Sequence, residues 1–163
     1  MDYVWSPWRY AYIAQAKTEK VSSCIFCDAL ARNDDAASFI VHRGNKVFII
    51  LNRYPYTSGH VMIVPYGHVA ELHLCEAGTL EELMQLAQLI EKAFGATYKP
   101  EGMNLGMNLG RAAGAGVAGH LHMHALPRWF GDTNFMTVTS ETRVHPEDLS
   151  TTYERLRKAL GSN

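Results

Sequence analysis

Three of the eight histidines in this 163-residue sequence occupy alternate positions, His120, His122 and His124. In an extended strand successive side chains point to opposite faces, so the three imidazoles would share one face, with Leu121 and Met123 on the other. Neighbouring histidines would lie roughly 6.5–7 Å apart, close enough to act on one substrate but too far to share a small metal ion easily. The row therefore predicts a strand with an apolar back and a chemically active front.

Two kinds of chemistry fit such a front. A histidine whose Nδ1–H is held by a backbone carbonyl can attack phosphorus through Nε2, and water or another acceptor then breaks the phosphoramidate. His122 is central and best placed to attack, and His124 could hold phosphate oxygens or the leaving group. Alternatively, the histidines could bind a catalytic metal that activates water, which requires a further ligand from a neighbouring strand. The spacing leaves both open.

A glycine-rich segment, residues 110–119, leads directly into the histidine row. Backbone N–H groups in such a loop, at Gly114, Ala115 and Gly116, can contact phosphate oxygens. The segment is not a Walker loop, because no Lys-Ser/Thr pair follows its last glycine. Taken alone it indicates only a turn, but its place before the histidines favours phosphate binding.

Two of the three cysteines form a Cys-x-x-Cys pair, Cys24 and Cys27. Such a pair is half of a zinc site, a redox dithiol or a chance spacing. A thioredoxin-like dithiol should follow a strand, and the polar residues 18–23 argue against one. Three cysteines do not form a disulfide scaffold, so a cytoplasmic location is expected.

Apolar patterning predicts the elements that must position these residues. Besides the histidine strand, strands are expected at residues 39–41, 47–51, 60–66 and 103–110. In the last of these, Met103, Leu105, Met107 and Leu109 should face the core. For the first three of these strands, residues 39–41, 47–51 and 60–66, the economical arrangement is an antiparallel meander.

Two helices and a short helical turn at 28–32 complete the prediction. Thr79 and Glu82 form a capping-box signature before a long amphipathic helix that should end at Tyr98. A last helix is expected from Pro146 to Leu160.

Composition limits the classes of function. Fifteen basic and 16 acidic side chains give a net charge of −1, so no overall field favours nucleic acid or an anionic membrane. The apolar runs are too short to span a bilayer, and the start lacks the features of a signal peptide. The length predicts one domain, residues 21–163, preceded by an aromatic arm at residues 1–20 that should dock on the core or on a partner subunit.

With these motifs in place, the sequence resembles the histidine triad family, whose hallmark is His-x-His-x-His followed by two apolar residues. The resemblance extends over nearly the whole chain, through residues 51–55, 58–61, 64–68 and 127–135 and the Trp-x-Pro-Trp-Arg segment of the arm. It is strongest to the bacterial branch related to fragile-histidine-triad hydrolases and to diadenosine tetraphosphate phosphorylase.

The resemblance implies an α+β homodimer in which each chain has a five-stranded antiparallel sheet packed with a long helix. It implies cleavage of dinucleoside polyphosphates, such as diadenosine tetraphosphate, at the α-phosphorus through a nucleotidyl-histidine. The acceptor, water or phosphate, stays open, and no organic cofactor is expected. A purine nucleotide-binding module or a nucleoside phosphoramidase is the alternative, and the His-x-His metallohydrolase is a weaker one.

The resemblance also implies residue roles. His122 is the nucleophile, His124 contacts phosphate and leaving group, and His60 supports the triad. Nucleotide contacts are expected from Asn52, Asn108, Gly114, Ala115, Gly116, His124 and Trp129. A closed structural zinc site would use Cys24, Cys27, His68 and His120. Relatives often carry Ser or Gln where this chain has Ala115 and Gly116, so only backbone donors remain there.

Overall fold

The computed structural model of the chain describes residues 24–133 and 147–161. The aromatic arm expected at residues 1–20 lies outside the described residues, as does Pro146, the predicted start of the last helix. The extent of the single domain, residues 21–163, therefore stays a prediction.

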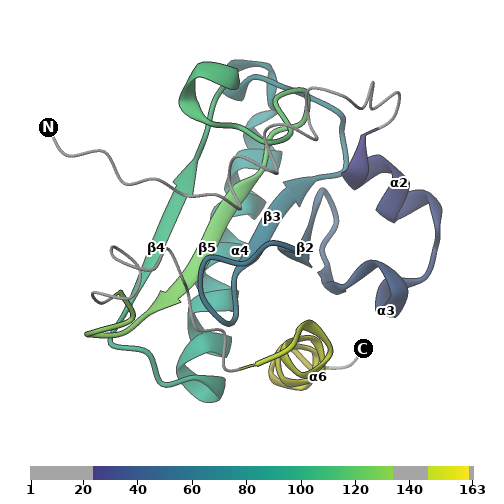
Figure 1. Cartoon of the computed structure of the whole chain (residues 1–163). Helices are drawn as coiled ribbons and strands as arrows, with labels where there is room; N and C mark the ends of the chain where they lie inside the picture. Colours follow the sequence, from purple (N-terminus) through teal and green to yellow (C-terminus); the bar gives the residue numbers. More distant parts are fainter. Residues whose placement is uncertain (1–23, 134–146, 162–163) are drawn as a thin grey trace, which may run out of the picture.

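A five-stranded antiparallel sheet forms the centre of the molecule (Figure 1). The strands lie in the order β1-β2-β3-β5-β4, and every neighbouring pair is antiparallel. Their bounds are Ile40–Arg43 for β1, Val47–Leu51 for β2, Val61–Pro65 for β3, Gly102–Met107 for β4 and Met123–Arg128 for β5.

The described helices surround this sheet. They are α2, Ile25–Ala31; α3, Asp35–Ser38; α4, Ala77–Thr97; and α6, Leu149–Ala159, with 3-10 turns η1 at Leu72–Leu74 and η2 at Arg111–Ala113. The long helix α4 runs along one face of the sheet, and α2 and α3 lie beside its β1–β2 end (Figure 1). The predicted α+β architecture of a five-stranded antiparallel sheet with a long helix is thus confirmed.

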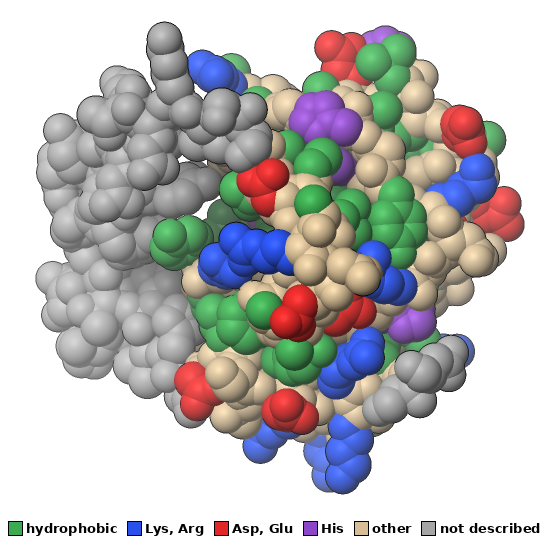
Figure 2. Space-filling view, turned by 90° about the vertical axis from the view of Figure 1, so that its right-hand side faces the viewer, with side chains coloured by type: hydrophobic (Ala, Val, Ile, Leu, Met, Phe, Trp, Pro, Cys, Tyr) green, Lys and Arg blue, Asp and Glu red, His purple; other side chains and the backbone are tan. Residues whose placement is uncertain are grey.

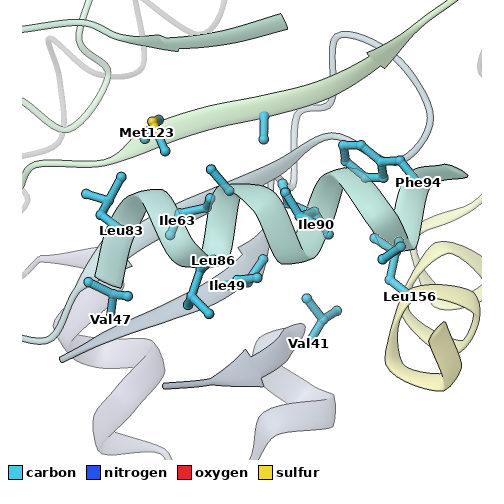
Figure 3. Close-up of a cluster of buried hydrophobic side chains, with 14 of the residues drawn as sticks. Val41, Val47, Ile49, Ile63, Leu83, Leu86, Ile90, Phe94, Met123 and Leu156 are labelled. Carbon is cyan, nitrogen blue, oxygen red and sulfur yellow. The ribbon is translucent and has the colours of Figure 1, made fainter. Parts of the chain in front are cut away.

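The larger hydrophobic core lies between the sheet and α4 (Figure 3). The predicted apolar stripe of α4 is buried: Leu83, Leu86, Ala87, Ile90, Ala93 and Phe94. Ile49 and Ile63 face this stripe from the strands, and Leu156 of α6 packs against the same core. Because burying one large apolar side chain stabilises a fold by about 1.5–3 kcal/mol, this stripe fixes α4 on the sheet.

A second hydrophobic cluster covers the opposite face of the sheet. It contains Phe26, Ala29, Ile40, Phe48, Ile50, Met62 and Val64. Alternate strand residues therefore enter different cores, Ile49 and Ile63 on the α4 side, Phe48 and Val64 on the other. Burial on both faces explains why β2 and β3 read as continuous apolar runs.

The histidine row differs from the continuous strand that was predicted. Since β5 begins at Met123, His124 belongs to the strand, whereas His120 and His122 precede it. The backbone before β5 leaves the ladder, and Leu121 N–H donates at 2.6 Å to a carbonyl in the loop after β3. Leu121 and Met123 are buried as predicted, but His120 and His122 are buried as well, with 1% and 4% of their surface exposed. The front of the row is therefore largely enclosed.

Strand β4 is shorter than predicted and lies at the edge of the sheet. Met103 and Met107 pack against the larger core as expected, but Leu105 and Leu109 are 42% and 47% exposed. Helix α4 packs on β2, β3 and β5. The edge strand β4 therefore lies beyond the part of the sheet that this helix covers. The prediction that all four side chains face the core was wrong for these two leucines.

The predicted capping box was also wrong. Helix α4 begins at Ala77, after Glu76 as N-cap, so Thr79 already lies within it. The carboxylate of Glu82 instead accepts hydrogen bonds from the backbone N–H groups of Asn45 and Lys46, each at 2.6 Å. A contact between distant segments has replaced the local one. Helix α6 begins after Asp148, whose carboxylate accepts from the N–H of residue 151 at 2.8 Å.

Candidate active site and metal centre

Four side chains from three separate segments meet beside the start of β5. The ligand atoms of Cys24, Cys27, His68 and His120 all lie within 4.8 Å of one another. Cys24 Sγ is 3.3 Å from His120 Nδ1, and Cys27 Sγ is 3.4 Å from His68 Nδ1 and 3.8 Å from His120 Nδ1. A tetrahedral zinc ion with ordinary bond lengths separates S and N ligands by roughly 3.5 Å. This Cys₂His₂ cluster can therefore hold a metal ion of that kind.

The second nitrogen of His120 fixes its orientation. His120 Nε2 lies 2.9 Å from the carbonyl oxygen of Pro65, which can only accept, so the ring carries its proton on Nε2. Nδ1 is then unprotonated and faces the cysteines. Burial lowers the pKa of His120 and so favours the neutral imidazole. Such a partner on the far side of the ring is typical of histidine metal ligands.

The next histidine of the row has the opposite tautomer. His122 Nδ1 lies 2.8 Å from the carbonyl oxygen of His120, so Nδ1–H donates and Nε2 keeps its lone pair. Burial lowers the pKa of His122 below its ordinary value. The ring is therefore a neutral imidazole whose unprotonated Nε2 can act as nucleophile or base.

A chain of hydrogen bonds sets the tautomer of His124. The backbone N–H of Tyr56 donates to His60 Nδ1 at 3.1 Å, which places the proton of His60 on Nε2. His60 Nε2 lies 2.9 Å from His124 Nδ1, so His124 accepts there and carries its own proton on Nε2. Burial, with a smaller effect of His122, lowers the pKa of His124 to about 4. His124 is thus a neutral donor beside His122, with ring centroids 5.0 Å apart.

Several predicted nucleotide contacts lie at this end of the sheet. The amide nitrogen of Asn52 is 3.4 Å from both ring nitrogens of His60. Asn108 follows Met107, which forms the last register pair with Met123, so Asn108 leaves β4 at the end of the sheet where His122 precedes β5. In the glycine loop, the N–H groups of Gly114 and Ala115 donate within the loop itself, at 3.0 and 3.3 Å.

Trp129 is not brought to the histidines. It follows the far end of β5, and its ring packs edge-on against Tyr98 at 6.3 Å between centroids. Seven residues of extended chain span roughly 23 Å, so a nucleotide at His122 would have to reach along β5 to touch it.

Two residues near the histidines had no role in the predicted site. The ring of Tyr56 lies 4.7 Å from that of His60, and Phe26 lies 5.3 and 5.2 Å from His120 and His122. The sequence offered one signal for Phe26, its place between the two cysteines. No sequence signal pointed to Tyr56 as a site residue, because its contact with His60 Nδ1 is made by the backbone N–H, which every residue except proline has.

On the face that includes α2 and α3, acidic and basic side chains of the described residues are interspersed, without an extended area of one sign (Figure 2). Phosphate binding on this face would therefore depend on single donors and not on the field of a basic patch. In the described ranges, no helix is both long and apolar enough to span a membrane.

A family model described as the HIT domain matches residues 33–131. The chain belongs to the HIT domain family. The resemblance to the histidine triad family is thus confirmed, and the matched range includes His120, His122 and His124.

Curated HIT relatives cover most of the chain. The chain is 36% identical over 154 residues to the AP-4-A phosphorylase of Mycobacterium tuberculosis. The aligned region covers 91% of this chain and 79% of that protein. It is 30% identical over 143 residues to an adenosine 5′-monophosphoramidase of Candida albicans, covering 85% of this chain and 92% of that one.

Solved HIT structures share the fold. A Zn-bound histidine triad family protein from Mycobacterium smegmatis matches with a TM-score of 0.70 at 27% identity, covering 85% of this chain and 93% of that one. That relative contains zinc, and the Cys₂His₂ cluster of this chain has the donor set to bind it.

Proposed function

We propose that this protein is a nucleotidyl hydrolase or transferase that cleaves dinucleoside polyphosphates, such as diadenosine tetraphosphate, through a nucleotide-linked His122. One observation carries the proposal, the pairing of opposite tautomers on adjacent histidines. His122 is held at Nδ1 by the carbonyl of His120, which leaves Nε2 free to attack. His124 is held at Nδ1 by His60, which leaves Nε2–H to donate.

In the first half-reaction, His122 Nε2 attacks the α-phosphorus and a P–N bond forms. The P–O bond to the departing nucleotide breaks, and its electron pair stays on the leaving oxygen. His124 Nε2–H donates a hydrogen bond to that oxygen or to a phosphate oxygen, which stabilises the developing negative charge. His60 supports this donor by occupying His124 Nδ1.

In the second half-reaction, water or inorganic phosphate attacks the same phosphorus. The P–N bond breaks, and its electron pair returns to His122 Nε2, which restores the neutral imidazole. Water gives up one proton to the solvent as its P–O bond forms and so releases AMP, whereas phosphate releases ADP. The M. tuberculosis relative, described as a phosphorylase, supports the phosphate acceptor. The C. albicans monophosphoramidase supports chemistry at a P–N bond and keeps phosphoramidate substrates as the second candidate.

The remaining predictions belong to the same proposal. Asn52, Asn108, Gly114, Ala115, Gly116 and Trp129 are proposed as nucleotide contacts. The contact of Asn52 with His60 and the place of Asn108 at the end of β4 beside the start of β5 support the two asparagines most strongly. The loop would present the Gly114 and Ala115 N–H groups only after giving up its internal hydrogen bonds. The enzyme is further proposed to be a cytoplasmic homodimer that acts on neither nucleic acid nor membranes.

Zinc is proposed as the ion of the Cys₂His₂ cluster. When bound, it would supply structural support and no chemistry, because four protein ligands leave no open position for water. Among the residues that the structure describes, this is the one grouping of candidate ligands that could hold a metal, and it takes only His120 from the row. That geometry disfavours a metallohydrolase based on His122 and His124.

The test compares wild type with His122→Ala on diadenosine tetraphosphate, with and without inorganic phosphate. Wild type should yield ATP with ADP if phosphate is the acceptor, and ATP with AMP if water is. Loss of the nucleophile should lower kcat by about 10⁴- to 10⁶-fold. Turnover by His122→Ala close to that of wild type would eliminate the mechanism. Tight nucleotide binding without turnover by wild type would instead indicate a binding module.

A further inference from the structure

We propose that Phe26 is a positioning residue for His122, and that through Phe26 the Cys₂His₂ cluster controls the orientation of the nucleophile. The inference rests on the proposed function for its kinetic consequence. Its structural part, the orientation of the His122 ring, can be tested independently.

Phe26 lies between the two histidines of different function. Its ring is 5.3 Å from His120, in an edge-on arrangement with planes at 73°, and 5.2 Å from His122, with planes at 47°. Phe26 is 1% exposed. One side chain therefore packs against both a metal ligand and the proposed nucleophile.

The orientation of His122 needs such a contact. Its one assigned hydrogen bond, from Nδ1–H to the carbonyl of His120, anchors one edge of the ring. A single hydrogen bond tolerates tilting, because its energy falls steeply only at large angles. The rings of Phe26 and His124 pack on the imidazole and limit its tilt, and so they aim Nε2.

The position of Phe26 depends in turn on the two cysteines. Cys24 is the N-cap of α2 and Cys27 lies in its first turn, so Phe26 sits on the seven-residue helix that the cluster holds. Besides the cluster contacts, Phe26 and Ala29 attach α2 to the second core. Without the cluster, this short helix would lose its attachment at the N-terminal end. It would keep its apolar packing and the hydrogen bond from Ser38 Oγ to the Ala29 carbonyl, and it would hold Phe26 less firmly. The Phe26 ring thereby links the metal site to the nucleophile, in addition to the hydrogen bond from His122 to the His120 carbonyl.

The experiment compares Phe26→Leu with the matched control Phe48→Leu. Both remove a fully buried ring from the same cluster, but the ring of Phe48 stacks on Tyr66, 5.4 Å away. Phe26→Leu should lower kcat by about 10- to 100-fold, the scale expected for a misplaced reacting group, with KM changed less than about twofold. Phe48→Leu should leave kcat near that of wild type after correction for the folded fraction.

The second readout is ¹⁵N NMR of histidine-labelled protein, which distinguishes a ring protonated at Nδ1 from one protonated at Nε2. Wild type should show His122 fixed as the Nδ1–H form. Phe26→Leu should show a mixture of forms or a broadened signal, and Phe48→Leu should resemble wild type. Removal of metal from wild type by a chelator should change the His122 signal in the same direction as Phe26→Leu. Phe26→Met, which keeps much of the volume without the ring, serves if Phe26→Leu does not fold.

Equal kinetic and NMR changes in the Phe26 and Phe48 variants would overturn the proposal, since the effect would then be general loss of core packing. An unchanged His122 signal after chelation would overturn the link to the metal cluster. If wild type fails to cleave any dinucleoside polyphosphate, the proposed function fails, and the NMR comparison still decides whether Phe26 positions His122.

Discussion

At the scale of residues, three chemically identical side chains have been given different properties by their hydrogen-bond partners. A carbonyl at Nε2 leaves Nδ1 of His120 able to bind a metal ion, and a carbonyl at Nδ1 leaves Nε2 of His122 able to act as a nucleophile. His60 makes His124 a donor through Nε2. Burial keeps all three triad rings neutral by lowering their pKa values.

The pH dependence of kcat/KM follows from these lowered pKa values. His122 must be unprotonated to attack, and its pKa lies below the ordinary 6.5, so it stays active as the pH falls through 6.5. The acid limb of kcat/KM should therefore lie below pH 6.5. Measurement between pH 4.5 and 8, with circular dichroism to confirm folding at each pH, checks this. A half-maximal value at or above pH 6.5 would contradict it.

Folding stability should change with pH in the same direction as activity: it falls when the pH is lowered. Neutral His124, with a pKa of about 4, is favoured by the fold over the charged form. Its contribution to the free energy of unfolding is complete above pH 6.5 and is lost as the pH falls toward 4, because the unfolded chain then binds more protons.

At the scale of elements, long-range contacts have displaced local ones. Glu82 would complete a capping box if α4 were isolated, but in the fold its carboxylate binds the N–H groups of the β1–β2 turn. Gly44 permits this approach, because a Cβ at that position would come within 2.5 Å of the Glu82 carboxylate. The hydrogen bonds to Glu82 thereby hold the β1–β2 turn and α4 together, and this contact is called the Glu82 brace below.

Replacing Glu82 tests this brace. Glu82→Ala should lower the free energy of unfolding by about 1–2 kcal/mol, since two turn N–H groups lose a charged acceptor. The neighbouring Glu81, whose contact is an exposed hydrogen bond from Gln85 at 3.2 Å, provides the matched control. Glu81→Ala should cost less than about 0.5 kcal/mol. Urea unfolding of both variants measures the difference, and equal losses would rule out the brace.

At the scale of the whole molecule, the sheet is covered by α4 on one face and by the α2 side on the other, where the histidines and the Cys₂His₂ cluster lie. The cluster joins α2, the loop after β3 and the segment before β5. A metal ion there would therefore connect three parts of the chain, and the proposed zinc should stabilise the entire fold.

Cys27→Ser should reduce the metal content and the Tm. A metal present at 100 times its Kd contributes about 2.7 kcal/mol, which corresponds to about 5–11 °C in Tm for a chain of this size. Cys75→Ser is the control, because Cys75 lies outside the cluster. Elemental analysis and thermal melts with and without chelator test the prediction. Similar melting of both variants in the presence of zinc would refute it.

The proposed homodimer is also a property of this scale. In the described part of the chain β4 pairs only with β5, and Leu105 on it is 42% exposed. An unpaired apolar edge strand is a ready surface for a second sheet. Light scattering should give twice the chain mass for wild type, and Leu105→Lys should shift the population to monomer. A monomeric wild type at micromolar concentration would end the proposal.

How much of this could be predicted depended on whether a feature was local. The apolar stripe of α4 and the strand pattern were predictable, because apolar residues recur every 3.6 residues in a helix and every second residue in a strand, and both periods can be read from neighbouring residues. The family resemblance predicted that Cys24, Cys27, His68 and His120 form one site, and the structure places their ligand atoms within 4.8 Å of one another. The start of α4 and the exposure of Leu105 were not predictable, since a contact from another segment and the position of an edge decide them.

The sequence by itself determined which side chains can do chemistry, because residue type and alternate spacing put three imidazoles in one short stretch. Only the tertiary structure decided what each imidazole can do. A neutral histidine can carry its proton on either nitrogen, and the choice follows from partners that are distant in sequence or belong to the backbone. The Pro65 carbonyl for His120, the His120 carbonyl for His122 and His60 for His124 make that choice here.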